Sequence, residues 1–489
     1  MKRRWMMGAA ALGAVAGCTP VETDTAAPEP LAVENSPDPQ VETPTRTQDP
    51  DPTVGGSLSV EVVPQFSTVL AGSPGHLDVL VRIQAADAPG AERPALDLAL
   101  VLDRSGSMRG EKLAAAKQAA LETVRKLDTE DRLTFISYDD RVNVHTHRAK
   151  VGDGKALQRE ILGIMDGGGT ALGPALRSGL DELTGSQRGE DALAHLMLLS
   201  DGLANEGESR PEVLAKWTAN AFGKGVATST LGVGLDYNED LMTRIADAGG
   251  GRYHFIETGD QVPEVLADEF DGLTATVARN VSLEVDASAG IELGDIPGYP
   301  NVVDGDVLMA KVGSMAAGRK RELLVRMDYQ APKGDSMPLG TYTLKFRDVL
   351  DEGKPVEIVV EPKVAVSQDA AVVEASENYA VTVRAQEIDV AAALQSASQR
   401  VEEGQYEDAR QQLQKKTEAL RKEAAENPDV NYAPMLEDLE EAEKDLDRAK
   451  DSVIERKLYK KKNKAKAYKR SKAYKPSKKK SKSKRKLDL

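Results

Sequence analysis

Cysteine is almost absent from this sequence, because its 489 residues include only Cys18. A single cysteine excludes an intrachain disulfide and any metal site built from several thiolates. Aromatic residues make up only 4% of the chain, so the cores are expected to be aliphatic. The chain is too long for one hydrophobic core, and its length predicts about three domains plus terminal segments.

The N-terminus lacks a hydrophobic run long enough to span a membrane. Residues 1–4 are basic and residues 5–16 are apolar, about a dozen residues where a spanning helix needs about twenty. This pattern predicts a cleaved signal peptide over residues 1–17.

Val15-Ala16-Gly17-Cys18 resembles the lipobox of bacterial lipoproteins, which implies export and a lipid anchor on Cys18. The alternative is ordinary signal-peptidase cleavage with an incidental cysteine. Thr19 stands where an inner-membrane retention signal would place Asp. The resemblance therefore implies a lipoprotein of the cell envelope, held at the outer membrane if the cell is Gram-negative.

Charge is distributed unevenly along the chain. The net charge is −15, yet residues 456–486 hold eighteen Lys and Arg and no acid. The acidic body disfavours nucleic-acid binding, and no specific nucleic-acid partner is expected. The tail, residues 457–489, is predicted to be disordered because like charges repel. It is interpreted either as a solvated terminus or as a segment that attaches to an anionic envelope polymer or lipid.

Composition and periodicity divide the rest of the chain. Residues 18–56 are rich in Pro, Thr and acids and predict a disordered stalk. Residues 57–90 and 271–370 contain short alternating segments typical of β-strands, and we expect the first set to complete a β-sandwich with the second. Residues 389–456 show helical periodicity with a hairpin at Gly404.

Residues 94–270 alternate apolar strands with amphipathic helices. This pattern predicts an α/β fold with a doubly wound, mostly parallel sheet covered on both faces. The α/β unit is either inserted in the β-sandwich or followed by it, and a C-terminal helical hairpin region completes the chain. In such sheets ligands bind at the carboxyl ends of the strands. Asp103 and Asp201 both lie at predicted strand ends.

Three predicted loops at these strand ends carry oxygen ligands. Asp103, Ser105 and Ser107 share one loop, Thr170 follows three glycines on a second, and Asp201 lies on a third. Hard divalent cations prefer such oxygens, and Mg²⁺ accepts one or two carboxylates together with water and a partner's donor. Serines that only cap the following helix would explain one loop but not three.

The spacing Asp-x-Ser-x-Ser, then Thr, then Asp resembles the metal-ion-dependent adhesion site of von Willebrand factor A domains. It matches at Asp103, Ser105, Ser107, Thr170 and Asp201. The resemblance covers about residues 95–270. It implies a Rossmann-like fold and a divalent cation, with Mg²⁺ preferred to Mn²⁺ or Ca²⁺. It also implies a protein ligand whose acidic side chain completes the coordination.

These observations predict an envelope lipoprotein that binds a protein ligand through a cation, for adhesion or scaffolding. The alternative is an assembly or chaperone-like factor that regulates a partner complex through the same site. Enzymatic activity is not expected. The sequence has no Gly-x-Ser-x-Gly elbow or His-Glu-x-x-His helix, and Ser105 stands where a haloacid-type phosphatase needs a second Asp.

Overall fold

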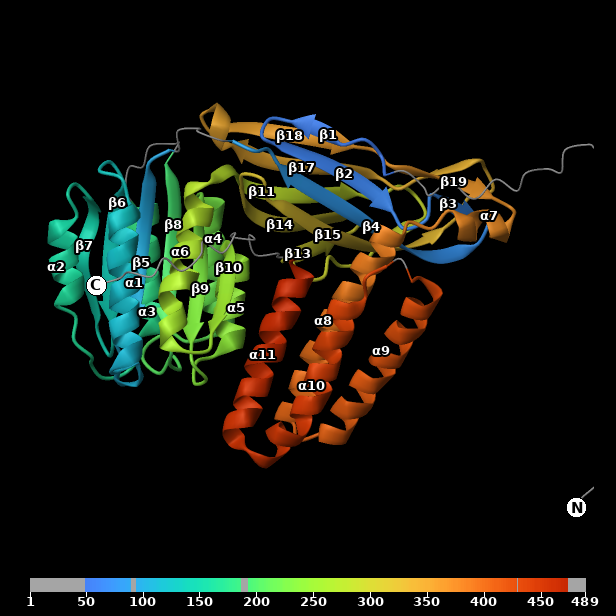
Figure 1. Ribbon diagram of the computed structural model, residues 1–489. Helices are drawn as coiled ribbons and strands as arrows, with labels where there is room; N and C mark the ends of the chain where they lie inside the picture. Colours follow the sequence, from blue (N-terminus) through green and yellow to red (C-terminus); the bar gives the residue numbers. More distant parts are fainter. Residues whose placement is uncertain (1–48, 89–93, 186–191, 429, 474–489) are drawn as a thin grey trace, which may run out of the picture. The chain divides into compact units, whose positions relative to one another are not determined.

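The computed structural model describes residues 49–88, 94–185, 192–428 and 430–473. The predicted signal peptide, Cys18, the stalk up to residue 48 and the tail from residue 474 lie outside the described residues. Figure 1 shows an α/β domain, two further extended β-sheets and a group of long C-terminal helices. Among the described helices, none is both long and apolar enough to cross a membrane.

The α/β domain is built on a six-stranded sheet in the order β10-β9-β8-β5-β6-β7. Its strands are β5 (Leu96–Asp103), β6 (Arg132–Tyr138), β7 (Val142–Lys150), β8 (Leu193–Ser200), β9 (Val226–Val233) and β10 (Gly250–Ile256). Only the edge strand β7 runs antiparallel to its neighbour. The predicted mostly parallel α/β sheet is confirmed.

Helices cover both faces of this sheet. The apolar side chains of β5 alternate between them: Leu98 and Leu100 pack on one face, and Ala99 and Val101 on the other. The first face is covered by α1 (Glu111–Lys126), α2 (Lys155–Leu162) and α6 (Val262–Thr274). The second is covered by α3 (Leu172–Thr184), α4 (Pro211–Gly223) and α5 (Glu239–Ala248). Because both faces are covered, the two ends of the strands are the places left for ligands.

Two five-stranded antiparallel sheets share one hydrophobic core. One contains β1 (Thr53–Gly55), β2 (Leu58–Pro64), β4 (Pro74–Ala85), β15 (Lys320–Gln330) and β12 (Ile291–Leu293). The other contains β13 (Asn301–Asp304), β14 (Val307–Ala316), β11 (Thr276–Asp286), β17 (Thr341–Asp348) and β18 (Lys354–Val360). β4 pairs with β15, so strands from before and after the α/β domain lie side by side. A small third sheet joins β16 (Ser336–Pro338), β19 (Lys363–Ser367) and β3 (Thr68–Leu70).

Two predictions in this region are wrong in detail. The stalk does not reach residue 56, because Thr53–Gly55 forms β1 and pairs with β2. Gly56 turns the chain between them at φ +55°, a conformation that glycine adopts without strain. The segment 271–370, predicted to form the β-sandwich, also contributes outside the two large sheets, because β19 lies in the small third sheet and not beside β18.

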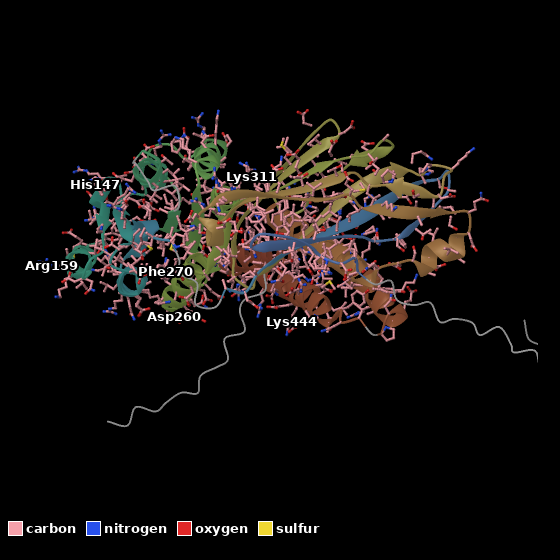
Figure 2. All side chains as sticks on the ribbon, turned by 90° about the horizontal axis from the view of Figure 1, so that it is seen from above. His147, Arg159, Asp260, Phe270, Lys311 and Lys444 are labelled. Carbon is pink, nitrogen blue, oxygen red and sulfur yellow. The ribbon has the colours of Figure 1, made fainter. Side chains whose placement is uncertain are left out.

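The C-terminal region is helical, as expected, and begins earlier than residue 389. Its helices are α7 (Ala370–Ala375), α8 (Tyr379–Glu402), α9 (Tyr406–Glu426), α10 (Ala433–Asp451) and α11 (Val453–Ser471). Asn378 caps α8 by accepting a hydrogen bond from the Ala380 amide. The α8–α9 hairpin turns at Gly404, which has φ +79°. Figure 2 draws the side chains on these regions, with Phe270 labelled on α6, Lys311 on β14 and Lys444 on α10.

The predicted disorder of the Lys-rich tail is wrong as far as residue 471, because α11 is a helix. Several of its lysines face carboxylates of other helices. Lys461 is buried against Glu239 of α5, with 2.9 Å between Nζ and Oε2, and Lys466 lies 2.7 Å from Glu441 of α10. Like-charge repulsion within the segment is offset by these opposite charges, which the composition of the tail alone did not reveal.

Candidate cation site

The five predicted ligand residues lie at the carboxyl end of the six-stranded sheet. β5 ends at Asp103, and β8 ends at Ser200 immediately before Asp201. Thr170 lies in the segment that leads into α3. Because β5 and β8 are parallel neighbours, their ends deliver both carboxylates to one edge.

Hydrogen bonds join four of the five residues into one group. The Ser105 and Ser107 hydroxyl oxygens lie 3.1 Å apart, and Ser107 Oγ donates to Asp201 Oδ1 at 2.6 Å. Asp103 Oδ1 accepts from the Ser105 amide at 2.8 Å. Its other oxygen, Oδ2, accepts from Ser200 Oγ at 2.7 Å.

Thr170 lies beside the same group, and Gly202 lies between its hydroxyl and that of Ser107. A Cβ atom at Gly202 would lie 3.1 Å from Thr170 Oγ1 and 3.4 Å from Ser107 Oγ. Asn205 positions Thr170, because its Oδ1 accepts a hydrogen bond from the Thr170 amide at 2.8 Å. Glycine at position 202 therefore keeps the space between two of the hydroxyls open.

Burial dominates the electrostatics of the group. Asp103, Ser105, Thr170 and Asp201 are buried, whereas Ser107 is exposed. Burial raises the pKa of Asp103 to about 6, against the lowering effect of the hydrogen bonds from Ser105 and Ser200, and the charge of Asp201 raises it further. Two buried carboxylates in one site favour a bound cation, because a cation offsets their desolvation and mutual repulsion.

One contact was missed by sequence reasoning. Lys112, in the first turn of α1, places its Nζ 2.5 Å from Asp201 Oδ2. From the sequence, Lys112, nine residues after Asp103, was interpreted as a solvated side chain or one that assists docking of an acidic partner, and not as a contact of Asp201. Arg109, by comparison, is exposed and pairs with Asp166 outside the group at 2.7 Å. A cation that used both oxygens of Asp201 would compete with Lys112.

The residues fit a hard cation by their donor chemistry. Two carboxylates and three hydroxyls supply oxygen donors, and the exposed Ser107 marks the side open to solvent. Elsewhere in the described residues, no three His, Cys, Asp or Glu side chains lie close enough together to hold a metal ion. The hydroxyl-rich edge is therefore the candidate cation site of the part of the chain that the structure describes.

A mostly parallel α/β sheet with helices on both faces is compatible with the von Willebrand factor A class of domains. The family model for the von Willebrand factor type A domain matches residues 97–268. The chain therefore contains such a domain, close to the predicted bounds of 94–270. All five site residues fall inside the matched segment.

Several known proteins are similar to this chain. The uncharacterized protein sll0103 of Synechocystis is 26% identical over 62% of this chain and 76% of its own length. The uncharacterized protein YfbK of Escherichia coli is 31% identical, over 42% of this chain and only 36% of its own length. A von Willebrand factor type A structure from Catenulispora acidiphila superposes with a TM-score of 0.63 at 17% identity, covering 80% of this chain and 89% of that one. This likeness shows the fold.

Proposed function

We propose that this protein is a cell-envelope lipoprotein that binds a protein ligand through a divalent cation at the von Willebrand factor A domain. The observation that carries the proposal is the convergence of five oxygen-bearing side chains at one sheet edge. Their residues are Asp103, Ser105, Ser107, Thr170 and Asp201. Mg²⁺ is the preferred cation, with Mn²⁺ or Ca²⁺ as alternatives.

The five side chains would bind the cation, and neighbouring groups would position them and leave the site accessible. Ser105, Ser107 and Thr170 would hold the cation through their hydroxyls, together with the carboxylates of Asp103 and Asp201. A bound cation supplies positive charge for an acidic side chain of the partner. The Ser105 amide and the Ser200 hydroxyl hold Asp103 in place. Gly202 leaves space between Thr170 and Ser107, and the exposed Ser107 leaves one side accessible.

Binding rather than catalysis is proposed for this site. The group contains hydroxyls and carboxylates but no histidine that would activate a serine as a nucleophile. Elsewhere, the His195 and Ser229 side chains do contact each other, with 3.0 Å between Nε2 and Oγ. Both are buried, and Ser229 Oγ donates to Glu269 Oε1 at 2.6 Å. That hydroxyl therefore packs inside the domain, where it orders the buried charges.

Attachment to the envelope is the second part of the proposal. It rests on the signal-peptide pattern of residues 1–17 and the lipobox ending at Cys18. The stalk that follows would hold the folded body away from the membrane, the outer membrane in a Gram-negative cell. Labelled palmitate should be incorporated into the wild-type chain and not into Cys18→Ser. Incorporation that survives the substitution contradicts the lipid anchor.

The architecture proposed with this function is an α/β domain inserted in a β-sandwich. The pairing of β4 with β15 from residues 74↔330 to 84↔320 supports it, because these strands flank the α/β domain in the sequence. Such an insertion leaves both ends of the domain anchored in one scaffold. The cation site then lies at the carboxyl end of the strands of the inserted domain.

Ligand capture tests the proposed binding. The purified protein is immobilised and exposed to envelope extract with Mg²⁺ or with EDTA, and the captured proteins are quantified. We expect EDTA, Asp103→Ala and Ser107→Ala each to reduce capture at least about tenfold, a loss of about 1.4 kcal/mol. The exposed Ser107 is included because its truncation leaves the core intact.

Asp140→Ala is the matched control, because Asp140 is an exposed carboxylate outside the group. Its capture should equal that of the wild-type chain. If the amount of captured protein is unchanged by EDTA, by Asp103→Ala and by Ser107→Ala, the proposal is wrong.

A further inference from the structure

A cavity lies at the opposite, amino end of the six-stranded sheet. It has a volume of about 90 Å³ and is lined from β10, α6, the β14–β15 turn and the end of α11. A water molecule needs only about 10–15 Å³ of such space. The cavity is therefore large enough for a compact ion, and too small for an extended polymer.

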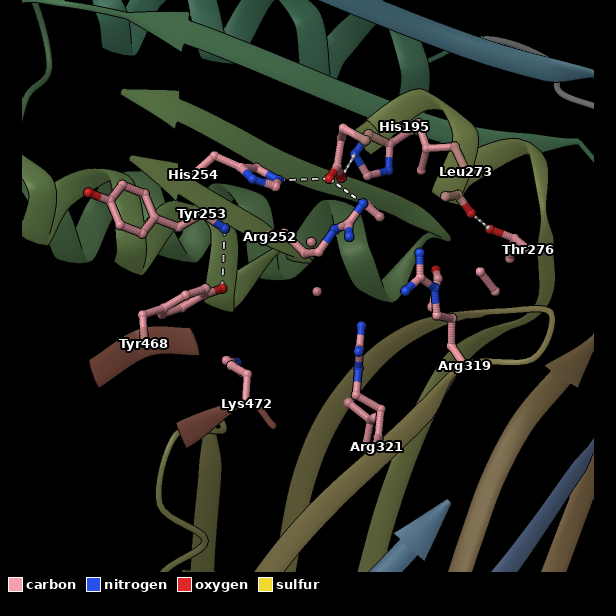
Figure 3. A pocket seen from close by; sticks show the side chains of 18 of the residues that line it. His195, Arg252, Tyr253, His254, Leu273, Thr276, Arg319, Arg321, Tyr468 and Lys472 are labelled. Atoms are coloured by element: carbon pink, nitrogen blue, oxygen red, sulfur yellow. Dashed lines mark hydrogen bonds and ion pairs between the residues drawn. The ribbon is translucent and has the colours of Figure 1, made fainter. Parts of the chain in front are cut away.

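Cationic side chains enter the cavity from three regions of the chain. Arg252 comes from β10, Arg319 and Arg321 come from the β14–β15 turn and β15, and Lys472 comes from the C-cap of α11. Figure 3 shows Arg319 and Arg321 pointing into the space from the β-sheet side, with Lys472 near its α11 side. Cations around a cavity of this size favour an anion inside it.

Nearby carboxylates offset only part of this charge. Buried Glu269 lies 2.5 Å from Arg252, and Asp247 lies 2.9 Å from Lys472 Nζ. Among the described residues, no carboxylate lies within ion-pair distance of the Arg321 guanidinium. The cavity thus contains a guanidinium whose natural partner, a bidentate oxyanion, is not supplied by those residues.

Lys472 is positioned for the same task. Its Nζ lies 4.5 Å from the ring centroid of Tyr299 and 5.5 Å from that of Tyr468. Burial lowers the pKa of Lys472, Asp247 raises it, and the charge of Arg321 lowers it further. The two cations therefore repel each other across the cavity, and an anion between them would relieve that repulsion.

We propose that this cavity binds a compact oxyanion with phosphate or carboxylate chemistry. Arg321 would hold it through a bidentate contact, with Lys472 and Arg319 adding charge. The site draws on the α/β domain, the β-sheets and α11 together, so a bound anion would stabilise their association. This inference is independent of the cation site, because it uses none of the same residues.

Titration of the full-length chain tests the site. Inorganic phosphate and acetate are titrated separately by calorimetry at an ionic strength held constant with sodium chloride. We expect saturable binding, which Arg321→Gln weakens at least about tenfold, because the charged bidentate contact to the anion is lost. The tighter of the two ions identifies the chemical group that the cavity prefers.

Lys320→Gln is the matched control, because it removes the same charge from the adjacent position of β15. Lys320 pairs with Glu322 at 2.9 Å and does not line the cavity. It should bind the anion as the wild-type chain does. Arg321→Lys keeps the charge without the bidentate geometry and should recover part of the affinity.

The melting temperature of each variant without anion shows whether it is folded. Absence of saturable binding of either ion by the folded wild-type chain overturns the proposal. Equal weakening in Arg321→Gln and Lys320→Gln overturns it as well, because binding would then reflect net charge only.

Discussion

The two ends of the six-stranded sheet carry opposite chemistry. At the carboxyl end, Asp103 and Asp201 gather with three hydroxyls, all contributed by the α/β domain itself. At the amino end, arginines and a lysine gather around a cavity, and they come from three regions of the chain. One sheet thus presents an oxygen-rich edge suited to a cation and a cationic edge suited to an anion.

The two ends differ in which side chains pair with their buried carboxylates. At the carboxyl end Lys112 contacts Asp201 from the surface, with its side chain 32% exposed. At the amino end, Glu269 is buried among Arg252, His254 and Ser229. The first end can exchange its side-chain cation for an ion from solution. The second depends on a carboxylate that belongs to the fold, so changes there are expected to affect stability most.

The largest expected effect follows from removing that carboxylate. Glu269→Ala removes the buried carboxylate that pairs with the half-buried Arg252 and His254, and breaking a buried ion pair costs about 3–5 kcal/mol. The free energy of unfolding, measured with urea, should fall by that amount. Glu264→Ala on the same helix is the control, because Glu264 is exposed and its loss should cost about 0.3–1 kcal/mol. Similar losses in both variants would show that Glu269 does not hold the amino end together.

Acid should weaken the amino end through His195. Burial lowers the pKa of His195 to about 4. The charge of Glu269 acts to raise this pKa, and the charge of Arg252 lowers it further. Between pH 6.5 and pH 5 the unfolded chain gains a proton on this histidine, whereas the folded chain does not. Stability is therefore lost as the pH falls, by about 1.5 kcal/mol over this window, because the slope rises from half to nearly all of about 1.4 kcal/mol per pH unit.

His195→Gln should remove this pH dependence. Burial raises the pKa of Glu269, but Arg252 and His254 hold it well below its usual value. The contribution of Glu269 to stability is therefore lost only below about pH 4.5. Subtracting the urea-unfolding curves of the two chains removes the contributions of other groups, Asp103 among them. If the difference between the two chains does not change with pH, His195 is not the titrating group.

The carboxyl end was predictable because its chemistry is local in sequence. Asp103, Ser105 and Ser107 lie on one loop, and a parallel α/β pattern brings the ends of β5 and β8 to one edge. Strand alternation also predicted that residues 57–90 and 271–370 contain β-strands. These inferences need only periodicity and the rule that ligands bind at strand ends.

The amino end and α11 were not predictable in the same way. Arg252, Arg321 and Lys472 are separated by long stretches of sequence, and only the packing of three regions brings them together. The lysines of α11 were judged by their mutual repulsion, whereas Glu239 and Glu441, far away in the sequence, offset it. Composition reports the charge of a segment and not the charge of the surface on which it folds.

The smallest expected effect tests the carboxyl end by removing its side-chain cation. Lys112→Met should raise the affinity for Mn²⁺ about tenfold, because the ion no longer displaces an ammonium from Asp201 and such a charged hydrogen bond is worth about 1.5–3 kcal/mol. Binding is measured by calorimetry, with Arg109→Met as the control for loss of a nearby exposed charge. If Arg109→Met raises the affinity equally, the gain comes from general electrostatics. A lower affinity in Lys112→Met would instead mean that the lysine orients Asp201 for the cation, so that the two ends of the sheet both depend on a fixed counter-charge.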